Sequence, residues 1–355
     1  MKKGTISAGS AALLLAWACS ARGQVMDRFT IQETREVVGF CDDTILLRAN
    51  SVSGNHNLWG RLLSTGEVFP IQTNPSADVY DMTLDGRTVL WGQAGSLYAF
   101  DLAARTTSLI TSESTQGSVS GDWCVWRKWA GGSYPNTTYD IVAFDRATGQ
   151  KMTISSTPMF RGIPKVSGNW VVWEEYAAGM QSSSVWGYNL STGQTLGIAT
   201  GPGSHNNPCI NGDIVLWRDF RSEIWGDIYG YNLATHTEFP VAVGAGYGEY
   251  PTIPDGDLVA WFDDRNHYPA TQGMVGVYDI YRTNLATGAS YPIATGNVYK
   301  SGFQTSNGVA IWSQTSSNGQ LLINGAYLVP EPATLSLLAL AGLAMLRRRT
   351  LTRPG

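Results

Sequence analysis

The sequence predicts an all-β fold, and three features support this prediction. Glycine, which suits tight turns, occurs 40 times among 355 residues, beside 13 Trp and 16 Tyr, which favour strands. A strand-like segment that ends in tryptophan recurs about every 44 residues. Hydrophobic residues make up 43% of the chain, so a sizeable core can form and global disorder is excluded.

Charge is distributed unevenly along the chain. The formal net charge is −4, from 24 basic and 28 acidic residues. Residues 1–23 and 333–355 contain seven of the basic residues and no acidic ones, so the remainder has 17 basic against 28 acidic side chains, a net charge of −11. Such an acidic body repels phosphate backbones, which argues against nucleic acid as a partner.

Residues 1–23 have the three parts of a secretory signal peptide. A short basic start precedes an apolar stretch over residues 6–18, and small residues follow before Gln24. We therefore expect a hydrophobic helix here, export of the protein, and removal of this segment by signal peptidase. The alternative, a lipoprotein signal anchored at Cys19, is disfavoured because Trp17 fits that motif badly.

The body of the chain, residues 24–328, is an internal repeat. Three clean copies are residues 168–173 (GNWVVW), 212–217 (GDIVLW) and 256–261 (GDLVAW). Degenerate copies end at Trp91, Trp126 and Trp312, and a seventh copy ends at Leu47. The spacings between the final residues are 44, 35, 47, 44, 44 and 51.

Each copy predicts four short strands. A strand precedes the glycine turn, a second ends in Trp, a third such as residues 185–190 leads into a Gly turn, and a short apolar strand such as 69–71 follows. Four strands in about 44 residues are typical of a β-propeller blade. We expect a single propeller of seven blades, with six as the alternative, and we expect the repeated Trp to pack between blades.

Closure of the ring is also encoded. The last unit stops at Leu328 before its fourth strand, while residues 29–32 (FTIQ) match the fourth strand of the first unit, residues 69–72 (FPIQ), at three of four positions. We expect this N-terminal strand to complete the last blade and leave only short, protected edges.

The repeat is similar to that of TolB-like, WD40-like propellers. Their blades share the order of apolar strand, Ser/Asp-Gly turn, strand, loop, a strand that ends in Asp or Asn-Leu, Gly turn, and strand. The resemblance covers roughly residues 27–328 and implies the architecture, without implying an activity.

Blade connectivity predicts which loops share a face. The long loops between second and third strands fall on one side, and in blades three to six they combine aromatic, acidic and Arg side chains. Such a rim suits recognition of a sugar or a protein. The binding-face candidates are Trp129, Tyr134, Tyr176, Asp219, Arg221, Trp225, Asp263, Arg265, His267 and Tyr268. Because Asp and Arg recur at equivalent positions in blades five and six, a structural Asp–Arg pair is the alternative there.

Signatures of catalysis are missing from the sequence. It contains no His-Glu-x-x-His, Gly-x-Ser-x-Gly, Walker or CxxC motif. His56, His205 and His267 fall on the long-loop side without ligand spacing, so we predict neither a metal site nor a cofactor. The sequence favours a non-catalytic binding or scaffold protein, with exopolysaccharide or envelope partners. The alternative is a secreted polysaccharide lyase or hydrolase with its site at the channel mouth.

Residues 329–355 form a distinct C-terminal segment. Val329, Pro330, Glu331 and Pro332 precede 14 apolar or small residues, and Arg347, Arg348 and Arg349 follow. Fourteen residues make about 21 Å of helix, less than a bilayer core of about 30 Å, so we expect a transient membrane helix or, alternatively, a plain anchor. The segment resembles the PEP-CTERM sorting signal of Gram-negative bacteria. That resemblance implies cleavage by an exosortase-type protease and delivery to the outer surface or extracellular matrix.

Overall fold

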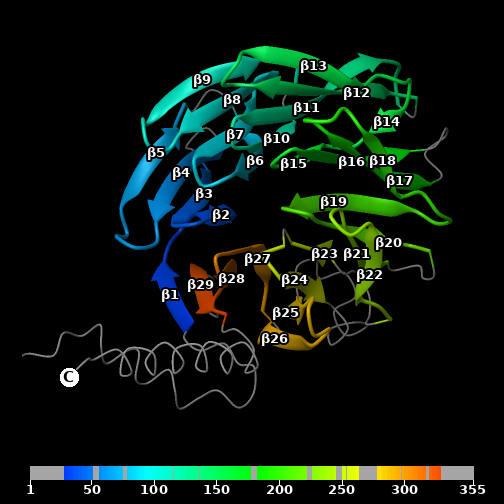
Figure 1. Cartoon of the computed structure of the whole chain (residues 1–355). Helices are drawn as coiled ribbons and strands as arrows, with labels where there is room; N and C mark the ends of the chain where they lie inside the picture. Colours follow the sequence, from blue (N-terminus) through cyan, green and yellow to red (C-terminus); the bar gives the residue numbers. More distant parts are fainter. Residues whose placement is uncertain are drawn as a thin grey trace, which may run out of the picture.

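The computed structural model of the chain describes residues 28–50, 56–74, 78–114, 116–134, 136–176, 182–221, 226–244, 250–252, 254–263, 278–296, 298–316 and 320–328. In these ranges the regular elements are β-strands, which form seven antiparallel sheets. The sheets stand around a common centre as the blades of one propeller (Figure 1). The predicted all-β fold with seven blades is confirmed.

The structure does not describe the two terminal segments. The signal peptide of residues 1–23, the sorting segment of residues 329–355 and the hydrophobic helices expected in both lie outside the described residues. Within the described ranges, no helix has the length and apolar character needed to cross a membrane.

Blades one to three each contain four strands that follow one another in sequence. Blade one consists of β2 (Glu36–Cys41), β3 (Thr44–Asn50), β4 (His56–Leu62) and β5 (Val68–Gln72). Blade two consists of β6 (Tyr80–Leu84), β7 (Thr88–Gln93), β8 (Ser96–Asp101) and β9 (Thr106–Thr111). Blade three consists of β10 (Gly117–Ser120), β11 (Trp123–Gly131), β12 (Thr138–Asp145) and β13 (Gln150–Ser155).

Blades four to six repeat this order, with one variation. Blade four has a divided inner strand, β14 (Phe160–Arg161) and β15 (Lys165–Ser167), followed by β16 (Trp170–Tyr176), β17 (Ser183–Asn189) and β18 (Thr195–Ala199). Blade five consists of β19 (His205–Asn211), β20 (Ile214–Asp219), β21 (Asp227–Asn232) and β22 (Thr237–Ala242). Blade six consists of β23 (Tyr250–Pro251), β24 (Leu258–Asp263), β25 (Asp279–Asn284) and β26 (Ser290–Ala294).

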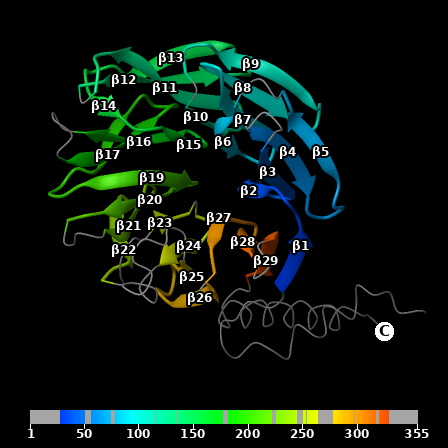
Figure 2. The same cartoon turned by 180° about the vertical axis from the view of Figure 1, so that it is seen from behind.

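Blade seven is completed by the N-terminal strand. Its sheet has the order β1 (Arg28–Gln32), β29 (Leu321–Tyr327), β28 (Val309–Thr315), β27 (Lys300–Ser306), and β1 lies beside β29 in both views (Figures 1 and 2). Phe29 pairs with Gly325, where an added Cβ would lie 2.0 Å from the Phe29 ring. Phe69 covers Gly60 in the same way in blade one, at 2.1 Å. The sequence match between the two strands therefore reflects one packing arrangement, and the predicted closure is confirmed.

The repeated aromatic residues form the core between blades. The Trp residues that end the second strands are at most 3% exposed, and Leu47 is fully buried. Trp126 of blade three packs with Leu90 and Leu97 of blade two. Trp217 of blade five packs with Val172 of blade four. The expected role of the repeated Trp in packing between blades is confirmed.

At five of the seven junctions between blades, a hydrogen bond joins the innermost turns, and we call this set of bonds the turn ring. In each case a side chain at or just after the end of an inner strand accepts from a backbone amide in the next blade. The hydroxyl of Ser120 accepts from the amide of Gly168 at 3.1 Å. Equivalent bonds run to Asp85 Oδ2 from Gly121 N (2.7 Å), to Ser167 Oγ from Gly212 N (2.9 Å), to Asp255 Oδ2 from Gly308 N (2.7 Å) and to Ser306 Oγ from Asp42 N (2.9 Å).

The turn ring explains the Ser/Asp-Gly pair of the repeat. The donor residue has a left-handed backbone, with φ of 54° at Gly168 and 55° at Gly212, which favours glycine. Asp42 adopts the same conformation at φ 53°, as short polar residues can.

Inside this ring the inner strands enclose a central channel of about 700 Å³.

We expect the closure strand to be essential for stability. Deleting residues 24–32 exposes the edge of β29 and should lower the melting temperature sharply and cause association. Phe29→Ala, which empties the space above Gly325, should cost about 2 kcal/mol in urea unfolding. Thr30→Ala, on the exposed side of the same strand, is the matched control and should stay within about 0.5 kcal/mol of the wild type. A deletion variant that melts like the wild type would show that β1 does not close the ring.

Candidate functional site

The long-loop face, which carries the loops between second and third strands, presents two exposed aromatic side chains from blade three. Trp129 near the end of β11 is 61% exposed, and Tyr134 in the loop after it is 81% exposed. They are the most exposed large hydrophobic side chains among the described residues. Exposed aromatic surface is costly in water unless a partner covers it, so this edge of blade three is a candidate contact surface.

Arg127, two residues before Trp129, is half-buried at the same end of β11. Its Nε donates to Gln116 Oε1 at 2.6 Å and its Nη1 donates to the Arg161 carbonyl at 3.0 Å. The guanidinium lies 4.4 Å from the ring centre of Tyr139. Burial lowers the pKa of Arg127. No carboxylate pairs with it among the described residues, so the guanidinium can accept an anionic group.

Aromatic rings connect Arg127 to blade four. Tyr139 of β12 meets Phe160 edge-on at 5.5 Å between ring centres, and Phe160 meets Tyr176 of β16 in the same way at 5.2 Å. Edge-to-face contacts of this kind are favourable aromatic geometries. The three rings bridge blades three and four at the end of the propeller that carries the long loops.

Glu174 lies beside Tyr176 and has an unusual carboxyl group. Its Oε2 accepts from the amide of Asn207 in blade five at 2.7 Å, and its Oε1 accepts from the Tyr176 hydroxyl at 3.2 Å. Burial raises the pKa of Glu174 above its usual range. Burial and the neighbouring carboxyl raise the pKa of Tyr176 to about 12. A carboxyl that keeps its proton to higher pH is able to donate it to a bound molecule.

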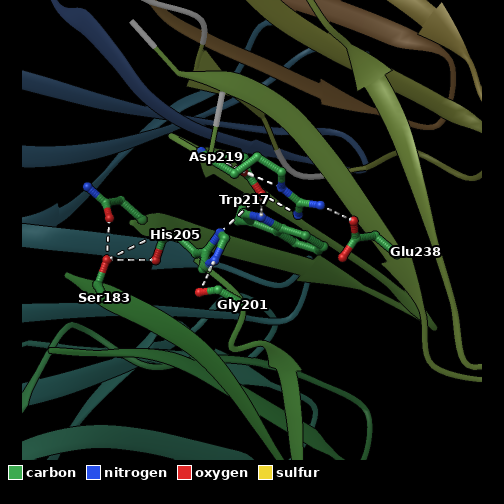
Figure 3. Close-up of polar contacts among 8 residues, drawn as sticks. Ser183, Gly201, His205, Trp217, Asp219 and Glu238 are labelled. Atoms are coloured by element: carbon green, nitrogen blue, oxygen red, sulfur yellow. Dashed lines mark hydrogen bonds and ion pairs between the residues drawn. The ribbon is translucent and has the colours of Figure 1, made fainter. Parts of the chain in front are cut away.

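A second polar cluster lies in blade five, around Asp219 (Figure 3). Asp219 is fully buried; its Oδ2 accepts from Trp217 Nε1 at 2.8 Å and lies 3.0 Å from His205 Nδ1. Arg221 donates from Nε to Oδ1 at 2.9 Å and from Nη2 to Oδ2 at 2.6 Å. Although burial alone would raise its pKa, hydrogen bonds from His205, Arg221 and Trp217 hold the pKa of Asp219 well below its usual range.

This cluster is organised for structure. Both oxygens of Asp219 are occupied, and Arg221 also donates to Glu238 at 2.7 Å. The Ser183 hydroxyl contacts the His205 backbone at 3.0 Å, so Ser183, His205 and Asp219 do not form a nucleophile–base–acid relay. The Asp–Arg pair suggested by the repeat is present in blade five. A cavity of about 480 Å³ beside it is lined by His205, Arg221 and Glu238, among others.

The sequence did not identify three buried basic side chains that link segments at the long-loop end. Arg161 is fully buried and binds Glu175 at 2.7 Å and the Tyr139 carbonyl of blade three at 2.6 Å. Its Nη1, the His205 Nε2 and the Lys300 Nζ each contact the carbonyl four residues earlier, at 2.8, 3.3 and 2.8 Å. The signal that could have found them is a basic residue at the start of an inner strand, repeated in blades four, five and seven.

The remaining candidates divide into those described and those not. Trp129, Tyr134 and Tyr176 gather at blades three and four, whereas Asp219 and Arg221 belong to the blade-five cluster. Asp263 is fully buried in blade six. Trp225, Arg265, His267 and Tyr268 lie outside the described residues. Of the three long-loop histidines, His56 binds Asp78 at 2.6 Å and His205 binds Asp219, and His267 is not described. Among described residues no three His, Cys, Asp or Glu side chains gather as a metal site.

Comparison with known proteins establishes the fold. An oligogalacturonate lyase in complex with manganese matches with a TM-score of 0.65 over 85% of this chain and 96% of its own, at 12% identity. An oligogalacturonate lyase from Vibrio parahaemolyticus gives 0.63 over 85% and 92%, at 13% identity. The propeller domain of the Trilobed protease from Pyrococcus furiosus gives 0.61 over 86% and 99%, at 10% identity. No family model matches the chain, and no curated protein matches it. At these identities the structural matches show a shared propeller fold.

We expect Asp219 to be a stability residue. Asp219→Asn leaves Arg221 and His205 without their carboxylate and should cost about 3–5 kcal/mol in urea unfolding at pH 7. Because the pKa of Asp219 is depressed on folding, its contribution is complete above the unfolded value near 3.8 and is lost as pH falls further. The variant should therefore lose less stability than the wild type on acidification. Asp213→Asn, which removes an exposed charge from the same blade, is the control. Equal stability of both variants would refute this role.

Proposed function

We propose that this protein is an exported propeller that binds a surface polymer, such as exopolysaccharide, without catalysis, through the long-loop end of blades three and four. The observation that supports this most is the exposure of Trp129 and Tyr134 near Arg127, which has no carboxylate partner among the described residues. Aromatic faces stack on sugar rings, and a guanidinium with free donors binds hydroxyl or carboxylate oxygens. The net charge of −11 over residues 24–332 disfavours dense polyanions such as nucleic acid.

The rim aromatics should be required for binding and dispensable for folding. The double variant Trp129→Ala with Tyr134→Ala should keep the wild-type melting temperature, because both side chains are exposed. On a glycan array followed by calorimetry, it should lose about 2 kcal/mol of binding free energy, roughly thirtyfold in Kd. Leu109→Ala removes an equally exposed apolar side chain from the outer strand of blade two and should bind normally. Unchanged binding in the double variant would rule out this surface.

A secreted polysaccharide lyase or hydrolase is the second candidate function, and Glu174 favours it. Its carboxyl has a raised pKa and lies beside Tyr176 and close to Arg127, as a general acid at a sugar-binding mouth would. The lyases that share the fold add nothing beyond the fold at 12–13% identity. Shortening of the bound glycan by the wild type, together with its loss in Glu174→Gln, would decide for the enzyme.

The cellular location of the protein is part of the proposal. The basic and apolar start of residues 1–23 supports export, and Pro330, Glu331 and Pro332 before the apolar stretch and Arg347–Arg349 support exosortase-type processing. The mature protein would then reside on the outer surface or in the extracellular matrix of a Gram-negative-type bacterium, in contact with the membrane only during transit.

Processing can be tested on protein recovered from the cell surface of the native host. Intact-mass spectrometry should show a chain that begins near Gln24 and ends near Pro330–Pro332, without the arginine cluster. A Pro330→Ala, Pro332→Ala variant should accumulate in the membrane fraction with its tail attached. Surface protein that retains Arg347–Arg349 would contradict cleavage and support a plain C-terminal anchor.

A further inference from the structure

We propose that the central channel holds a binding site for one carboxylate or similar small oxyanion, with Lys165 as its charged anchor. The site lies in the channel enclosed by the inner strands, apart from the rim aromatics of blade three. It is assigned by a ring of equivalent positions, by unpartnered polar groups in that ring, and by the contrast with another buried lysine.

Lys165 belongs to a ring of seven equivalent positions along the channel. It pairs with Val172, the residue before the repeated Trp of its blade, Trp173. In each of the other blades, the equivalent position is the inner-strand residue that lies opposite the residue before the repeated Trp, or before Leu47 in blade one. These residues are Gly39, Thr83, Ser118, Cys209, Thr252 and Gln304. Lys165 is therefore the one charged side chain at a level where the other six are small or neutral.

The ammonium of Lys165 has no partner among the described residues. Lys165 lines the channel, and no hydrogen bond or ion pair joins its side chain to the described part of the protein. Removal from water lowers its pKa, opposed only by Cys209 and Asp81. Burial also raises the pKa of the Cys209 thiol to about 12, so this thiol is uncharged and Asp81 is the one carboxylate acting on Lys165.

Lys300, a lysine with a structural role, has hydrogen-bond acceptors around its ammonium, and Lys165 has none among the described residues. Lys300 is 2% exposed, and its Nζ donates to the carbonyls of Tyr278 at 2.7 Å and Gly296 at 2.8 Å. A desolvated ammonium is costly unless such acceptors surround it. Lys165, which is half-buried along the channel, has no such acceptor among the described residues. The difference indicates that its acceptor comes from outside the protein.

Two neighbours of Lys165 in the ring also lack partners. Ser118 of blade three and Thr83 of blade two line the channel, and their hydroxyl oxygens are buried without a hydrogen bond among the described residues. Ser118 is 5% exposed. Three consecutive blades thus place a hydroxyl, a hydroxyl and an ammonium at one level; the two hydroxyl oxygens are themselves buried, so each side chain would turn about its Cα–Cβ bond to donate to a group in the channel. An oxyanion, which offers several acceptor lone pairs around one charge, matches this set of donors.

The two ends of the channel differ in charge, which sets the direction of entry. At the short-turn end the channel is lined by Asp42, Asp85 and Asp255, and an anion is repelled there. Toward the long-loop end, Arg127 has no carboxylate at hydrogen-bonding distance among the described residues, and its charge offsets that of Asp81, the carboxylate that acts on both Arg127 and Lys165. We infer that the anion enters from the long-loop end. The ligand is a free small carboxylate or a carboxylate carried by a sugar.

Calorimetric titration of the exported protein at constant ionic strength tests the site. Glucuronate, acetate and phosphate are the probes, and glucose is the neutral control. We expect one equivalent of a carboxylate to bind, with at least tenfold weaker binding to Lys165→Gln and Lys165→Met. Lys151→Gln, which removes an exposed lysine from blade three, should bind like the wild type. Acetate as tight as glucuronate would identify the carboxylate alone as the ligand, and tighter glucuronate would identify an acidic sugar.

A second measurement separates a ligand site from a structural lysine. Because its ammonium is unpartnered, Lys165→Met should melt at or above the wild-type temperature without ligand, and added glucuronate should raise the melting temperature of the wild type only. Absence of binding by all three anions, equal binding by Lys165→Gln, or a strongly destabilised Lys165→Met would each overturn the proposal. The variant Trp129→Ala with Tyr134→Ala should retain anion binding, so failure of the rim proposal and failure of this one are distinguishable.

Discussion

The turn ring is the interaction on which the rest of this structure depends. Each of its bonds, such as that from the Gly168 amide to Ser120, fixes one blade to the next at the innermost point of the ring. A small change in the angle between two neighbouring blades at the centre moves their outer strands a long way. These short bonds therefore determine the angle between blades. They also set the width of the channel. The packing of the Trp residues between blades and the meeting of β1 with β29 both require that geometry to repeat.

The two ends of the propeller are fastened by different chemistry, and this difference leaves one end free to vary. At the short-turn end a Ser or Asp and a glycine repeat in blade after blade. At the long-loop end each fastening is individual: a guanidinium in Arg161, an imidazole in His205 and an ammonium in Lys300, each on carbonyl oxygens. The turn ring and the packed Trp residues stabilise the propeller. The loops that follow these three side chains can therefore differ in length and composition, as functional loops on a rigid scaffold do.

The structural features that could be predicted from the sequence are those that depend on local periodicity. Strand alternation and the repeat placed Trp126 in the core, and the match between Phe29 and Phe69 located the closing strand because each ring covers a glycine on the adjacent strand. Contacts between blades have no fixed sequence spacing, so the partners of Arg127, 34 residues from Arg161, could not be read from the chain. Asp219 was assigned to the face by connectivity, whereas it is buried among three donors: His205 of β19, Trp217 of its own strand β20, and Arg221 two residues after it.

The strongest argument for a ligand comes from comparing the hydrogen-bonding partners of the buried charged side chains. Asp219, Arg161 and Lys300 are each surrounded by two or more hydrogen-bonding partners, which shows that this fold can satisfy a desolvated charge in several blades. Arg127 donates to Gln116 and to the Arg161 carbonyl and lacks only a carboxylate partner, whereas Lys165 has neither an acceptor nor a carboxylate at hydrogen-bonding distance among the described residues. In a chain that carries 28 acidic side chains, a counter-charge for Lys165 would be easy to supply by substitution. An ammonium left without an acceptor along the channel is therefore better explained by an anionic ligand than by packing.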